Sequence, residues 1–163
     1  MNEPAETLEH LFLLRLRGQG PEHPRTRATL QNLIVGKRTR AADIGATEAE
    51  LPEGIDPDGV RLDGDHVDAE IHLQQLAMHL QQHRVDKLGG DDPRTMIATA
   101  YLAYALALGD HLDGQVESAA VLAEDAHDGL ADAADEHAEH LGDHDLETAA
   151  FIHEWISEKL ALS

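Results

Sequence analysis

The chain has 163 residues, with 32 Asp and Glu against 12 Lys and Arg, which gives a formal net charge of −20 at pH 7. It contains no cysteine, so disulfide frameworks, thiolate nucleophiles and Cys-ligated zinc sites are excluded. Hydrophobic residues make up 42% of the chain but aromatic residues only 3%, so a core must be built mainly from Ala, Leu, Ile and Val. This composition favours closely packed helices over a β-sandwich.

The first 65 residues predict a pair of basic helices followed by an acidic connection. Residues 3–17 carry Leu and Phe at helical spacing, and the stretch GQGPEHP ends this first helix. A second helix is predicted over residues 24–42, because Pro24 suits a first helical turn and apolar residues recur along one side. Residues 43–65 are rich in Gly, Pro and Asp, which predicts a loop or a small hairpin.

Four more helices are predicted over residues 66–88, 93–108, 112–141 and 145–162. The stretch IATAYLAYALAL is apolar nearly all round, which makes residues 93–108 the central helix. Residues 112–141 carry a heptad seam that lets a neighbouring helix approach closely; its members are Val116, Ala119, Ala123, Ala126, Leu130, Ala133 and His137. We therefore predict an all-α single domain of five to six helices, whose last four, from about residue 66, form an antiparallel helical bundle.

The tetrapeptide LGDH occurs at residues 108–111 and again at 141–144, 33 residues apart. This spacing is typical of a helix-pair repeat, but the positions around the two copies do not fit the tetratricopeptide pattern. We interpret the repeated tetrapeptide as a signal that ends a helix at both places.

No run approaches 18 consecutive apolar residues, and the start MNEPAETLEH lacks the basic and apolar regions of a signal peptide. We expect a cytoplasmic or virion-associated protein without a membrane partner. Its Lys-poor acidity is typical of a halophilic protein, because the screening length falls to about 3 Å at 1 M salt. The alternative is an acidic surface evolved for a basic partner.

The basic residues are concentrated near the N-terminus. Residues 15–40 hold seven of the twelve Lys and Arg and one acid, Glu22. Such a segment could pair with acids of its own chain, dock on an acidic partner or a second copy, or contact nucleic-acid phosphates. It has no aromatic residue on which bases could stack. The predicted partner-binding or polyanion-binding residues are Arg25, Arg27, Lys37, Arg38 and Arg40.

Histidine pairs four residues apart on a helix can bind a metal ion. His79 and His83 form such a pair, and His72 lies two turns before His79, so these three are the candidate metal ligands. Glu124 and His127 match one Glu-x-x-His motif of di-iron bundles, which need two. Residues 139–161, EHLGDHDLETAAFIHEWISEKLA, resemble the last helical hairpin of ferritin-like stress proteins, which implies a metal-binding bundle.

No nucleophile elbow, phosphate-binding glycine loop or dinucleotide fingerprint is present, so we predict neither a catalytic residue nor an organic cofactor. The function that we favour is a non-enzymatic interaction or assembly component, cellular or viral, whose basic N-terminal segment docks on an acidic partner. The alternatives are a nucleic-acid-associated regulator and a metal-binding ferritin-like bundle.

Overall fold

The computed structural model describes residues 5–35, 66–108, 115–136 and 144–162. Within these ranges the chain forms six α-helices and no strand, which confirms the predicted all-α class. The helices are α1 (Ala5–Gly18), α2 (Pro24–Val35), α4 (His66–Leu88), α5 (Pro93–Leu108), α6 (Gln115–Glu136) and α7 (Asp145–Leu162).

The bounds of α4, α5 and α7 agree with those predicted from the sequence. Helix α1 ends one residue later than expected, at Gly18, and α6 lies within the predicted range 112–141. Helix α2 is described as far as Val35, so the rest of the predicted second helix lies outside the described residues. The same holds for the predicted connection over residues 43–65. The division into one domain with three segments stays a prediction.

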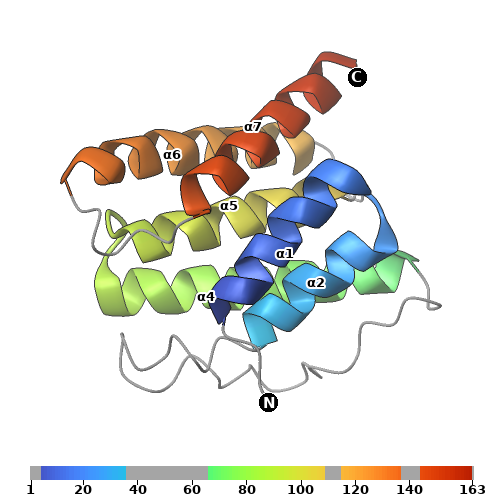
Figure 1. Cartoon of the computed structure of the whole chain (residues 1–163), viewed down its shortest axis with the longest axis horizontal. Helices are drawn as coiled ribbons and strands as arrows, with labels where there is room; N and C mark the ends of the chain where they lie inside the picture. The colour runs from blue at the N-terminus through green and yellow to red at the C-terminus, as the bar shows by residue number, and fades with distance from the viewer. Residues whose placement is uncertain (1–4, 36–65, 109–114, 137–143, 163) are drawn as a thin grey trace.

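The helices from α4 onward form a bundle around α5, as expected. Figure 1 shows α4, α5 and α6 side by side with α5 between them, while α7 lies across α6 and the α1–α2 hairpin lies across the front of the bundle. Helix α5 packs against α4, α6 and α7, and α1 packs against α2 and reaches α7. Twelve of the sixteen residues of α5 are buried, which confirms it as the central helix.

The alanine-rich seam of α6 faces the interior. Its described members are all buried, namely Val116, Ala119, Ala123, Ala126, Leu130 and Ala133, whereas His137 lies outside the described residues. At Gly129 of α6, a Cβ atom would overlap Met96 Sδ of α5, so a larger residue there would require the Met96 side chain to move. Small side chains thus bring α5 and α6 close together, as the seam predicted.

Aromatic rings attach the N-terminal hairpin to the bundle. Phe12 of α1 lies edge-on to Tyr101 and Tyr104 of α5, with ring centroids 5.9 and 5.3 Å apart. All three side chains are buried, so this cluster fixes α1 on the central helix. None of the helices in the described part of the chain is both long and apolar enough to span a bilayer.

Candidate functional site

The turns that join α1 to α2 and α4 to α5 follow the same sequence pattern, Arg-x4-Gly-x3-Pro-Arg-Thr. One copy begins at Arg15 and the other at Arg84. In each copy the glycine follows the end of the first helix and has a positive backbone φ angle, which is 98° at Gly20 and 86° at Gly89. Glycine suits both positions because a side chain is strained in that conformation.

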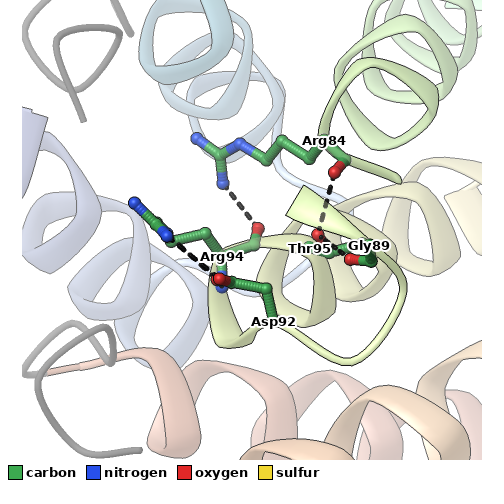
Figure 2. A network of polar contacts seen from close by, with 5 residues as sticks. All are labelled: Arg84, Gly89, Asp92, Arg94 and Thr95. Carbon is green, nitrogen blue, oxygen red and sulfur yellow. Dashed lines mark hydrogen bonds and ion pairs between the residues drawn. The ribbon is translucent and has the colours of Figure 1, made fainter. Parts of the chain in front are cut away.

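The second copy is a network of hydrogen bonds around the buried side chains of Arg84 and Thr95 (Figure 2). Thr95 Oγ1 donates to the carbonyl oxygens of Arg84 and Gly89, at 3.3 and 2.8 Å. The guanidinium of Arg84, which is 1% exposed, donates from Nη1 to the carbonyl oxygen of Arg94 at 2.7 Å. The threonine and the first arginine therefore bind the end of one helix to the start of the next.

The first copy has the same contacts between the equivalent residues. Thr26 Oγ1 lies 3.4 Å from the carbonyl oxygen of Arg15 and 2.9 Å from that of Gly20. Arg15 Nη1 lies 3.5 Å from the carbonyl oxygen of Arg25 and donates to Thr29 Oγ1 at 2.6 Å. The pattern thus produces one hairpin turn twice, and the first copy forms a wall of the site described below.

The two copies differ at the residue before the proline, which caps the second helix. In the α4–α5 turn, Asp92 Oδ1 accepts from the backbone N of Arg94 at 2.9 Å, and the same carboxylate pairs with the Arg94 guanidinium through both oxygens. In the α1–α2 turn, His23 Nδ1 accepts from the backbone N of Arg25 at 3.0 Å. An imidazole cannot form the forked ion pair that Asp92 makes, and Arg25 is exposed.

The described part of the basic segment is used largely within the chain. Arg17 pairs with Glu147 of α7 at 2.6 Å, and Arg15 belongs to the turn network. Arg27 is only 5% exposed, whereas a docking strip along the second helix requires its guanidinium at the surface. Of the predicted partner-binding residues, Arg25 is therefore the exposed one among those described, and Lys37, Arg38 and Arg40 lie outside the described residues.

The predicted histidine ligands are only partly brought together. The rings of His79 and His83 on α4 have centroids 6.4 Å apart and both side chains are half-buried, while the side chain of His72 lies outside the described part. Over the described ranges, no three His, Asp or Glu side chains are grouped so as to hold a metal ion. In the Glu-x-x-His motif, Glu124 is exposed and the ring of His127 stacks on His153 of α7. A metal role stays a prediction.

A groove lies where the α1–α2 turn meets the C-terminal half of α7. One pocket of about 400 Å³ is lined by the turn residues 19–23 and by Trp155, Glu158 and Lys159. A second pocket of about 260 Å³ is lined by Pro21, Phe151, Glu154, Trp155 and Glu158. Because both pockets share Pro21, Trp155 and Glu158, we treat them as one surface, the Trp155 groove.

The central helix fixes both walls of the Trp155 groove. The hydroxyl of Tyr104, a residue fully buried in α5, donates to the carbonyl oxygen of Pro21 at 2.5 Å. The ring of Tyr104 also lies beside that of Trp155, with centroids 5.6 Å apart. Pro21 and Trp155, which line both pockets, are 134 residues apart in sequence, and Tyr104 of α5 contacts both of them.

A lysine of the chain itself lies at one end of the groove. Lys159 Nζ lies 5.4 Å from the centroid of the Trp155 ring and 3.4 Å from Glu22 Oε1. It also donates to the carbonyl oxygen of Ala107, in the last turn of α5, at 2.5 Å. The ammonium group thus stabilises the carboxyl end of the central helix and uses the tryptophan as a cation–π acceptor.

The Trp155 groove is not among the sites predicted from the sequence. Trp155 is the sole tryptophan of the chain, and Glu154 and Glu158 flank it on α7, which is a local signal that the sequence contains. The opposite wall, at Pro21, comes from a turn that the sequence marks only as a helix stop.

Searches of protein-family models, of curated proteins and of solved structures found no match to this chain.

Proposed function

We propose that this protein is a non-enzymatic protein-interaction or assembly component, and that the Trp155 groove is a docking surface. The observation that carries the proposal is the position of Trp155. This half-buried side chain lines two adjoining surface pockets of about 400 and 260 Å³, and Pro21 and Phe151 lie beside it. Apolar pockets with a few placed polar groups are the usual form of a binding site, and tryptophan is prominent at interface hot spots.

The charged groups around the Trp155 groove also support a docking role. The side chains of Glu22 and Glu154 are exposed, as is that of Glu158, so their carboxylates lie at the rim. A rim of charged groups around an apolar centre is typical of a protein–protein interface.

The proposal is tested by charge reversal at the groove in a pull-down at native salt. Wild-type protein, Glu154→Lys/Glu158→Lys, and the control Glu124→Lys/Asp128→Lys are used as tagged bait. The control residues are also exposed, also four apart and on α6. We expect a partner that is retained by wild type and by the control and is lost by the groove variant. Equal retention by all three baits contradicts the groove as a docking surface.

A second candidate is the docking of the basic N-terminal segment on an acidic partner. The exposure of Arg25 supports it, and His23 occupies the position of the aspartate that pairs with the counterpart Arg94 in the other turn. Arg38 and its basic neighbours in the same segment lie outside the described residues. Reversal of Arg25 together with Arg38 to Glu should release an acidic partner without lowering the melting temperature; retention of that partner contradicts this candidate.

A further inference from the structure

The two pockets of the Trp155 groove differ in charge. The larger pocket has a cation at its edge, Lys159, together with His23 and the acids Glu22 and Glu158. The smaller pocket has two acids, Glu154 and Glu158, and no Lys, Arg or His among the residues that line it. Its other lining residues are apolar or aromatic. The smaller pocket therefore combines carboxylates with rings and lacks a cation of its own.

The carboxylates and the rings lie on one side of α7. Glu154 and Glu158 are four residues apart, as are Phe151 and Trp155, so each pair shares a helix face. Pro21 closes the pocket from the opposite side and is fixed there by the hydroxyl of Tyr104. A flat cation in this pocket would lie between Pro21 on one side and the rings and carboxylates of α7 on the other.

The neighbouring lysine shows that the tryptophan accepts a cation. Lys159 Nζ already lies 5.4 Å from the Trp155 ring centroid on the side of the larger pocket. Its ammonium is bound to the carbonyl oxygen of Ala107, so it belongs to the fold rather than to the smaller pocket. Cations over tryptophan are the strongest of the cation–π pairs in proteins.

We infer that the smaller pocket of the Trp155 groove, formed by Pro21, Phe151, Glu154, Trp155 and Glu158, receives an arginine side chain from a basic peptide segment of a partner protein. This inference rests on the proposed docking function and names the chemistry of the partner. Guanidinium is favoured over ammonium because it is planar, stacks on aromatic rings and pairs with carboxylates through two parallel hydrogen bonds. The net charge of −20 also favours the approach of a basic segment.

Because Trp155 is the sole tryptophan, its fluorescence reports directly on the pocket. Full-length protein is titrated with three capped Gly/Ser peptides that carry one central arginine, lysine or citrulline, at the lowest salt at which circular dichroism shows the folded protein. Citrulline has the shape of arginine without its charge. We expect a saturable fluorescence change with the arginine peptide, at least tenfold weaker binding with citrulline and several-fold weaker binding with lysine.

Matched variants assign the binding to the pocket. Glu154→Gln and Glu158→Gln should each weaken binding of the arginine peptide at least fivefold, whereas Glu124→Gln, an equal charge change at an exposed position of α6, should leave it unchanged. Equal binding of the arginine and citrulline peptides, equal binding of the arginine and lysine peptides, or no effect of either Glu→Gln variant overturns the inference.

Failure of the arginine inference and failure of the proposed docking function give different results. If no arginine peptide binds while the retained partner is still lost by Glu154→Lys/Glu158→Lys, the docking surface stands and the arginine assignment fails. If the arginine peptide binds but the pull-down shows no difference between the baits, the proposed function fails and the pocket is only a cation site.

Discussion

Asp92 and His23 occupy the same position in two copies of one turn, and they show what a single side chain contributes. Both accept a hydrogen bond from the backbone N of the second residue of the following helix. Asp92 adds a carboxylate at a helix N-terminus and a forked ion pair with Arg94, whose side chain is 12% exposed. The aspartate satisfies an amide that would otherwise lack a partner and also complements the helix dipole.

We therefore expect Asp92→Ala to lower the free energy of unfolding by about 1–2 kcal/mol. Replacement of His23 by Asp should raise it by up to about 1 kcal/mol, because it restores the cap found in the other turn. Urea unfolding followed by circular dichroism measures both changes. Asp91→Ala is the control, because Asp91 is exposed and the change in charge is the same; an equal loss for Asp91→Ala and Asp92→Ala contradicts the cap.

Arg25 and Arg27 are two residues apart on α2 but differ in environment, since Arg25 is exposed and Arg27 is 5% exposed. A glutamate at position 27 would place a carboxylate in a nearly enclosed site and remove the contacts of the arginine. We expect Arg27→Glu to cost about 3 kcal/mol or more, and Arg25→Glu to change stability by less than about 0.5 kcal/mol. Thermal melts that shift by the same amount for both variants would show that Arg27 is not enclosed.

At the scale of the element, α6 depends on small side chains. Ala119, Ala123 and Ala126 are each 1% exposed or less, and they lie on the side of α6 that packs against the bundle. The helix has few large apolar residues with which to compensate for a poor fit, so its contribution to stability comes from close approach of the backbones. Interiors packed in this way respond to the addition of even a few methylene groups.

Ala123→Leu should therefore lower the free energy of unfolding by about 1–3 kcal/mol, because leucine overfills the contact. Ala131→Leu makes the same change at an exposed position of the same helix and should be nearly neutral. Chemical denaturation of both proteins gives the comparison. A leucine that is tolerated equally well at the two positions would mean that α6 does not pack along this seam.

At the scale of the whole molecule, the net charge of −20 is the dominant feature. The acids repel one another in the compact state, because 32 Asp and Glu are opposed by only 12 Lys and Arg. Salt screens this repulsion because the Debye length falls from about 10 Å at 0.1 M to about 3 Å at 1 M. The same charge would speed the encounter with a basic partner at low salt.

The melting temperature should accordingly rise as the salt concentration increases from dilute buffer to above about 1 M. Differential scanning calorimetry in NaCl and in KCl measures this dependence, and agreement between the two salts identifies screening as the cause. A melting temperature that is flat or falls with salt would refute the prediction of a halophilic protein.

The helices could be predicted from the sequence because their signals are local. The bounds of α4, α5 and α7 follow from apolar spacing and from Gly and Pro at their ends, and the buried seam of α6 follows from its heptad pattern. The repeated pattern Arg-x4-Gly-x3-Pro-Arg-Thr was also available in the sequence. Its importance was not apparent, because its hydrogen bonds become visible only when two helices are placed together.

The sequence by itself determined the all-α class and the central place of α5, since both depend on residues within a few turns of one another. It predicted five to six helices, and the described residues form six. Only the tertiary structure decided that Arg27 is buried while Arg25 is exposed, because helical spacing does not say which neighbour covers a face. It alone also formed the Trp155 groove. Pro21 and Trp155 lie far apart in sequence and meet because Tyr104 of the central helix contacts both of them.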